Sequence, residues 1–163
     1  MEVLNDFIVS IKRSFTEIDP NWELYPGLII GGTHSPHDVE DMLERISHAR
    51  KTGLPFYGEC FGHQLAAIQY ARQAGIKDAT SEEFGTGSGT SVVKRLPKLN
   101  VGMKLVDGRY ESFWNNYEVV IPWEKPSNFF TAQFHPSYNS SVDNPHPLIL
   151  SYLRYAKYFS SLV

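Results

Sequence analysis

The sequence contains one cysteine in 163 residues, so it cannot form an internal disulfide bond. It also lacks an apolar stretch near the ~20 residues of a membrane-spanning helix, and no basic segment followed by an apolar one opens the chain. We therefore expect a protein of the reducing cytoplasm, without a membrane partner, in which a reactive thiol stays usable.

An excess of positive charge is missing as well. The chain carries 15 Lys and Arg against 18 Asp and Glu, a formal net charge of -3, and no basic run is longer than a pair. Nucleic-acid-binding domains usually present a basic patch, so we expect no nucleic-acid partner. No Gly-x-x-x-x-Gly-Lys-Ser/Thr loop is present, so any ATP-driven step would need a separate chain.

Two consecutive segments have the pattern of strand, turn and helix. The first is an apolar run at 27–33 followed by a helix over 35–51 that Ser35 caps, and the second is a strand at 54–58 followed by a helix over 64–75. Parallel neighbours require crossover connections. This order therefore predicts an α/β fold with a mostly parallel sheet flanked by helices, in a flavodoxin-like arrangement.

The remaining segments are consistent with a single domain over residues 1–163. Apolar residues recur at helical spacing over 5–18, short β-rich runs follow residue 80, and a helix over 147–160 closes the chain.

Cys60 lies in "PFYGECFGHQLAA", where the second strand should pass into its helix. A nucleophile on such a turn is exposed at the carboxyl end of the sheet, and the flanking Gly58 and Gly62 would let a substrate approach. The amino terminus of the following helix favours a thiolate and offers N–H groups to an oxyanion. The alternative is that Cys60 is a small buried apolar residue.

A nucleophilic cysteine needs a base, and His135 is the best placed of the six histidines. It ends the apolar run "FFTAQF" and begins a loop, so it should lie at the same edge of the sheet as Cys60. His48 and His63 fall within helical patterns, where packed or solvated side chains are expected.

The remaining alternative is a metal site in which His34 and His37 of "THSPHD" are ligands. Structural zinc takes four closely arranged ligands, and one cysteine with scattered histidines does not supply that spacing. We expect no metal and no cofactor.

The segments "GECFGHQ" and "AQFHPSY" resemble the Gly-x-Cys-x-Gly-x-Gln and His-Pro-Glu motifs of class I glutamine amidotransferases. "LIIGGTHSP", "TSEEF" and "PHPLIL" follow the order seen in the glutaminase domain of CTP synthase, so the resemblance covers most of residues 27–153. It implies that Cys60 attacks the side-chain amide of glutamine to give a thioester and ammonia. His135 would protonate the ammonia and then activate water.

The same resemblance implies further roles in binding. Backbone N–H groups would form an oxyanion hole, and two side chains would hold the amino-acid end of the substrate. The residues at these positions are Gly31, Gly32 and Phe61 for the oxyanion hole and Gln64 and Glu83 for the substrate.

The third catalytic position departs from the family. Ser137 stands where the family has a glutamate, and a serine can orient an imidazole but cannot offset its charge. Activity could therefore be weak, with Glu118 or Asp143 as substitutes that are near in sequence. If the missing acid limits the reaction, Ser137→Glu should raise activity.

Three other departures concern the surroundings of the site. Asn116 aligns with an arginine that binds the substrate's α-carboxylate, and an amide cannot make that charge-assisted fork. Glu59 directly precedes Cys60, and its charge would oppose a thiolate unless the side chain turns away. Only 26 residues precede Gly27, so the sheet should be shortened at the N-terminus, which favours a homodimer.

The sequence leaves three functions open. The first is a glutaminase-type hydrolase that passes ammonia to a synthetase partner in trans. The second is a catalytically impaired relative that binds a ligand or regulates a partner, and the third is a cysteine hydrolase of another small amide.

Overall fold

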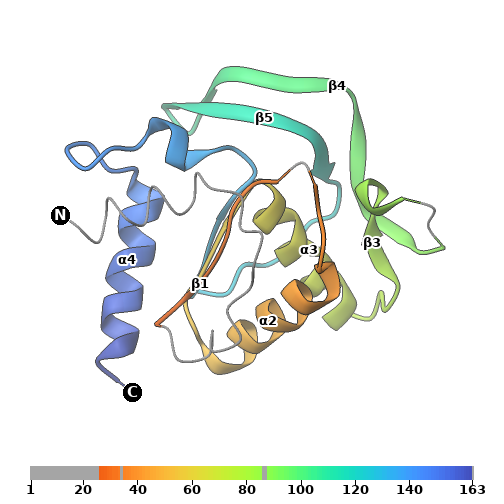
Figure 1. Cartoon of the computed structure of the whole chain (residues 1–163), viewed down its shortest axis with the longest axis horizontal. Coiled ribbons are helices and arrows are strands. Elements are labelled where there is room, and N and C mark those ends of the chain that lie inside the picture. Colours follow the sequence, from red (N-terminus) through yellow and green to blue (C-terminus); the bar gives the residue numbers. More distant parts are fainter. Residues whose placement is uncertain (1–25, 34, 86–87, 163) are drawn as a thin grey trace.

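The structure is a computed structural model that describes residues 26–33, 35–85 and 88–162. The helix expected over 5–18 and the expected shortening at the N-terminus fall outside these residues. Strands and helices alternate in the first half of the described chain, and strands dominate the second half (Figure 1). The elements are β1 (Leu28–Ile30), α2 (Val39–Thr52), β2 (Phe56–Glu59), α3 (Phe61–Gln73), β3 (Ala79–Ser81), the 3-10 helix η2 (Glu82–Phe84), β4 (Thr90–Val106), β5 (Arg109–Val119), β6 (Phe129–Ala132), the 3-10 helix η3 (Pro136–Asn139) and α4 (Pro147–Ser160).

The central sheet has the order β1-β2-β6, and both pairings are parallel. This confirms the α/β prediction. Because the strands are parallel, their carboxyl ends meet at one edge of the sheet. The chain leaves β1 there into Gly31 and Gly32, leaves β2 into Cys60, and leaves β6 toward His135.

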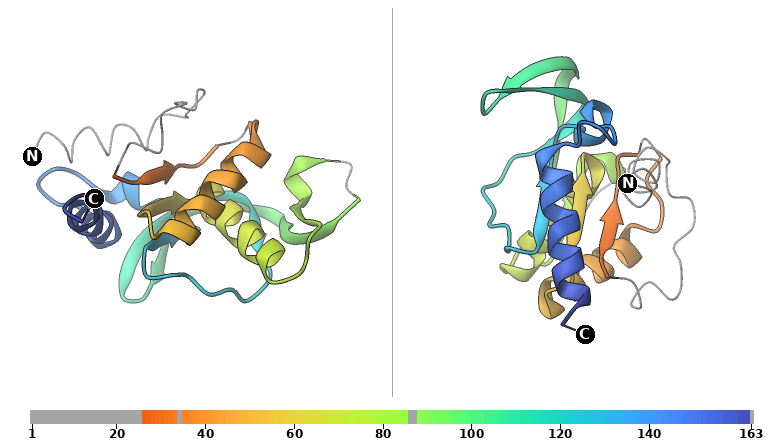
Figure 2. Two further views of the ribbon diagram at one scale, coloured as in Figure 1. Left: turned by 90° about the horizontal axis from the view of Figure 1, so that it is seen from below. Right: turned by 90° about the vertical axis from the view of Figure 1, so that its left-hand side faces the viewer.

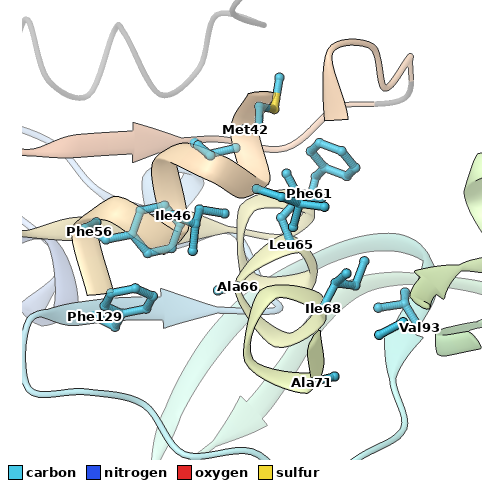
Figure 3. Packing of buried hydrophobic residues seen from close by; sticks show 14 of the residues in the cluster. Met42, Ile46, Phe56, Phe61, Leu65, Ala66, Ile68, Ala71, Val93 and Phe129 are labelled. Carbon is cyan, nitrogen blue, oxygen red and sulfur yellow. The ribbon is translucent and has the colours of Figure 1, made fainter. Parts of the chain in front are cut away.

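Helices cover both faces of this sheet, as the two views of Figure 2 show. Phe56 belongs to the larger apolar cluster, formed with α2 and α3, whereas its neighbour Tyr57 packs with Ile149 and Tyr152 of α4. Consecutive residues of a strand face opposite sides of a sheet, so one short strand joins the two cores. Figure 3 shows Phe56, Ile46 and Leu65 packed together in the larger cluster.

The start of α2 differs from its prediction. The helix begins at Val39, not at residue 35, and its N-cap residue is Asp38, which has a left-handed backbone with φ 52° and no capping hydrogen bond from its side chain. A left-handed residue interrupts the right-handed helical path, so Ser35 lies outside the helix. The predicted cap at Ser35 was therefore wrong, whereas α4 has the bounds expected for the closing helix.

The β-rich runs after residue 80 merge into a longer unit than their sequence suggests. Strands β4 and β5 form an antiparallel hairpin whose register shifts between Arg95 and Asn100. Pro97 lies inside that irregular stretch, where a residue without an N–H can be accommodated. In Figure 1 the hairpin passes over the carboxyl edge of the central sheet, and Ser112 of β5 accepts a hydrogen bond from the backbone of His135 at 2.8 Å.

Within the described part of the chain, no helix combines the length and the apolar character needed to cross a membrane.

Candidate active site

Cys60 occupies a sharp turn between β2 and α3. Its backbone has φ 52° and ψ -97°, and it is the N-cap residue of the helix. A side chain other than glycine in this conformation costs ~1–3 kcal/mol, which the surrounding structure must offset. Such a strained strand-to-helix turn is typical of a nucleophile elbow. It also places Cys60 at a helix amino terminus, where backbone N–H groups lack acceptors within the helix.

The glycines around Cys60 are required by close packing. A Cβ atom built on Gly58 would lie 2.9 Å from the backbone carbon of Gly62, and one built on Gly62 would overlap the carbonyl oxygen of Ile30. Strand β2 and the first turn of α3 therefore approach each other and β1 more closely than side chains allow. The Gly-x-Cys-x-Gly spacing has a steric cause in this fold.

His135 reaches the same edge from the segment after β6. Its Nε2 lies 3.3 Å from the carbonyl oxygen of Trp114, and the Sγ of Cys60 lies 3.9 Å from that oxygen. A Cβ atom built on Gly32 would be 3.0 Å from Cε1 of His135 and 3.5 Å from Cβ of Cys60. The structure thus brings together the cysteine, the histidine and the Gly-Gly loop, which are far apart in sequence.

Glu59 contacts the other nitrogen of His135. Its Oε1 lies 3.1 Å from Nδ1 of the imidazole and accepts a 2.7 Å hydrogen bond from the hydroxyl of Ser137. Its Oε2 accepts hydrogen bonds from the backbone N–H of Ser137 at 3.1 Å and from the hydroxyl of Tyr57 at 2.9 Å. The carboxyl group is buried, with 2% of the side chain exposed. Glu118 and Asp143, the substitutes considered from the sequence, are exposed.

The surroundings of His135 favour its charged form. A carboxylate faces Nδ1 and a carbonyl oxygen faces Nε2, and both nitrogens carry a proton only in the imidazolium. Burial alone would lower the pKa, but hydrogen bonds to Cys60 and Glu59, together with their charges, raise the pKa of His135 to about 10. At neutral pH the imidazole is therefore a cation placed between a carboxylate and a sulfur.

Two further side chains, which the sequence motifs did not single out, contact this pair. Gln133 points its Nε2 at the Sγ of Cys60 at 3.7 Å, and Tyr138 stacks on the imidazole of His135 with ring centroids 4.6 Å apart. Gln133 lies two residues before His135 and Tyr138 three after it, so one short segment supplies all three. Gln64, a predicted substrate residue, donates from Nε2 to the carbonyl of Tyr117 at 3.0 Å.

The other predicted residues have varied settings. Phe61 is buried as the first residue of α3, and Gly31 is buried at the end of β1. Glu83 is partly buried, and this burial raises the pKa of its carboxyl group. Asn116 is exposed, whereas its neighbour Asn115 is buried. Ser137 is fully buried and bonds to Glu59.

Two of the remaining histidines are packed inside the protein. His63 lies 3.1 Å from the hydroxyl of Thr131, and burial, aided by the charge of Lys125, lowers its pKa to about 3. His146 caps α4 and pairs with buried Glu111 at 2.9 Å. Among the described residues, no three His, Cys, Asp or Glu side chains gather closely enough to hold a metal ion. His34 lies outside those residues.

The sequence that contains the Cys60 turn matches a known protein family. The family model described as glutamine amidotransferase class-I matches residues 6–120, which include Cys60. The chain belongs to this family.

The relatives of the chain are consistent with this membership. CTP synthase from Encephalitozoon cuniculi is 28% identical over an alignment of 178 positions that covers 79% of this chain and 33% of the relative. CTP synthase from Carboxydothermus hydrogenoformans is 29% identical over an alignment of 179 positions that covers 78% of this chain and 33% of the relative. The chain thus spans about a third of the length of these curated relatives, and within the class I amidotransferases it is similar to the CTP synthases.

A solved structure has the same fold. The glutaminase domain of Trypanosoma brucei CTPS, with bound acivicin, matches with a TM-score of 0.71 at 22% identity, over 86% of this chain and 77% of that one. At this identity the likeness concerns the fold, and the parallel sheet flanked by helices is that of a class I amidotransferase domain.

Proposed function

We propose that this chain hydrolyses glutamine, or a related side-chain amide, through a thioester on Cys60. The observation that carries the proposal is the convergence of Cys60 Sγ and His135 Nε2 on one oxygen atom, that of Trp114, at 3.9 and 3.3 Å. A substrate amide group at that place would have its carbon within reach of the nucleophile and its nitrogen within reach of a proton donor.

In the first step the thiolate of Cys60 attacks the amide carbon, and a tetrahedral oxyanion forms. The backbone N–H of Phe61 and one from the Gly31-Gly32 segment are the proposed donors to this oxygen, since both segments border the cysteine. The imidazolium of His135 gives its Nε2 proton to the leaving nitrogen. Ammonia departs, and an acyl thioester remains on Cys60.

In the second step the now neutral His135 accepts a proton from water, and the hydroxide equivalent attacks the thioester. The carbon–sulfur bond breaks, releasing the carboxylic acid and restoring the thiolate and the imidazolium. With glutamine as substrate the products are glutamate and ammonia. Gln133, whose amide points at Sγ, would stabilise the thiolate in both resting and departing states.

Glu83 and Gln64 are the proposed contacts to the amino-acid end of the substrate. A carboxylate suits an ammonium group, and the partial burial of Glu83 would strengthen such a pair. Asn116 leaves the α-carboxylate without an arginine at the aligned position, so an amide that lacks this carboxylate is the alternative substrate class. Because the matched relatives are CTP synthases, we also propose that a synthetase partner receives the ammonia.

A second function, ligand binding or regulation without turnover, is favoured by the burial of the two reactive side chains. Cys60 and His135 have only 7% and 5% of their surfaces exposed, and strand β5 lies against both. If β5 does not yield, no amide can reach the sulfur, and the domain would act only through its surface.

Covalent labelling with acivicin, followed by mass spectrometry, separates these functions. The hydrolase predicts a single adduct on Cys60 that glutamine suppresses and that Cys60→Ala abolishes. Lack of any adduct, under conditions in which a known glutaminase is fully labelled, would favour the binding function. An adduct that glutamine does not suppress would indicate the other amide substrates.

A further inference from the structure

We propose that Glu59 is the acid of this site: it holds His135 in its catalytic orientation and offsets its charge, the task expected of residue 137. Glu59 is a positioning residue, because it contacts the imidazole and not the atoms that react. The inference rests on the proposed use of Cys60 and His135, but its test includes a readout independent of turnover.

The position of Glu59 in β2 explains how it reaches the histidine. Side chains alternate along a strand, so Glu59 projects on the same side as Tyr57. The carboxylate of Glu59 accepts a 2.9 Å hydrogen bond from the hydroxyl of Tyr57. The left-handed backbone of Cys60 then turns the chain into α3. Glu59 therefore meets Nδ1 of His135, while Cys60 lies near the Trp114 oxygen that Nε2 contacts. The imidazole ring separates the two residues, so the carboxylate supports the imidazolium.

The hydrogen bonds of Glu59 are those of an ionised carboxylate. Its two oxygens receive four donors, namely the Ser137 hydroxyl and N–H, the Tyr57 hydroxyl and the His135 ring. A carboxylate has about four lone-pair positions for donors, whereas a protonated acid would need one partner to accept. Burial and the charge of Glu59 raise the pKa of Tyr57, which keeps its hydroxyl a donor. A charge this deeply buried needs a counterion, and His135 is the cation in contact with it.

Ser137 acts as a hydrogen-bond donor to the carboxylate of Glu59. Both its N–H and its hydroxyl bond to Glu59, so the residue two positions after the histidine receives a carboxylate and does not supply one. A glutamate at position 137 would direct its own carboxylate toward this same buried region. The carboxylate beside Nδ1 is thus supplied from position 59 in place of position 137, and the two positions meet there.

A buried ion pair could also serve stability alone, and the experiment has to separate that role from positioning. Glu59→Gln preserves the size of the side chain and removes its charge, and Tyr57→Phe is the matched control, because it removes a different donor to Glu59 while leaving the carboxylate on His135. For each variant, thermal unfolding shows that the chain is folded. Three quantities are then measured: the midpoint of His135 titration by NMR of labelled histidine, the rate of Cys60 alkylation by iodoacetamide at pH 7, and kcat for glutamine hydrolysis.

Positioning predicts that Glu59→Gln lowers the His135 midpoint by about 1 to 3 pH units, slows alkylation at least tenfold, and reduces kcat on the order of 10³- to 10⁴-fold with little change in KM. Tyr57→Phe should move each quantity much less. A folded Glu59→Gln variant whose titration midpoint and alkylation rate match those of the wild type would overturn the inference. If the wild type neither hydrolyses glutamine nor reacts with acivicin, the proposed function fails, while the titration midpoint still decides the role of Glu59.

The change in the position of the acid is tested by moving the carboxylate from residue 59 to residue 137. Glu59→Ala combined with Ser137→Glu should recover at least a tenth of the alkylation rate lost in Glu59→Ala. Its matched control, Glu59→Ala combined with Ser137→Gln, has a side chain of the same size without the charge and should recover none. Equal rates in the two double variants would show that the positions are not interchangeable and would overturn that part of the inference.

Discussion

Gly62 and Ile30 are in direct backbone contact, because a Cβ atom built on Gly62 would overlap the carbonyl oxygen of Ile30. The contact joins the end of β1 to the first turn of α3, on either side of the Cys60 elbow. It fixes the distance between the Gly31-Gly32 segment and the cysteine, both of which the proposed oxyanion hole needs.

Substitution of Gly62 should therefore affect stability and the site together. We expect Gly62→Ala to lower the free energy of unfolding by ~2–4 kcal/mol, since the carbonyl oxygen of Ile30 is a backbone atom and cannot move aside as a side chain would. Gly53→Ala is the matched control, because Gly53 has a φ of 77° but no atom near its Cβ position, and should cost only ~1–2 kcal/mol for the left-handed backbone. Urea unfolding measures both, and equal losses would argue against the steric contact.

Stability should also vary with pH in opposite directions around neutrality. The folded-state pKa of His135, about 10, exceeds the ordinary value of 6.5, so its contribution is complete below pH 6.5 and is lost as the pH rises through 10. The folded-state pKa of His63, about 3, is below that value, so its contribution is present above pH 6.5 and is lost as the pH falls toward 3.

Urea unfolding from pH 4 to pH 10 measures this dependence. The free energy of unfolding should pass through a maximum near pH 6 to 7. Replacement of His135 by asparagine should flatten the alkaline side, and replacement of His63 by asparagine should flatten the acidic side. An alkaline limb that is unchanged without His135 would contradict the assigned charge.

Ser137→Glu should lower activity, although the sequence alone suggested a gain. Residue 137 is fully buried and bonds to Glu59 through its N–H and its hydroxyl. A second carboxylate there would replace a donor by a like charge, which we expect to cost ~3–5 kcal/mol of stability. Thermal unfolding and acivicin labelling check this, with Ser137→Ala as the control that removes the hydroxyl alone. A Ser137→Glu variant as stable and more active than the wild type would restore the original expectation.

The features that followed from sequence are those set by local patterns. The strand, glycine, cysteine and glycine around Cys60 predicted an elbow because only close backbone packing requires glycine on both sides. His135 followed from its place at a strand end, since parallel strands end at one edge. The bounds of α4 followed from Pro147 and the apolar spacing after it.

The features that could not be derived depend on side-chain direction and tertiary contact. The sequence shows Glu59 as a charge beside the nucleophile, but the spacing does not reveal that its side chain turns toward His135 and Ser137. A charge at a strand end expected to be buried was the available signal, because such a group needs a partner. Gly102 and Pro97 suggested breaks between short strands, whereas the hairpin accommodates both within β4.

Glu59, Cys60 and His135 form the proposed site. Glu59 and Cys60 are consecutive residues, so one peptide unit joins two of these three residues. Only the displacement of the His135 segment against β2 remains for tertiary structure to set, and the hydrogen bond from the Cys60 N–H to the Ala132 carbonyl, 2.9 Å long, restrains it. Slippage of β6 by a single residue would carry the ring ~3.3 Å along the strand, away from acid and sulfur alike. The register of β6 against β2 therefore governs the contacts of His135 with Glu59 and with Cys60 at once, and a change of register would disrupt both.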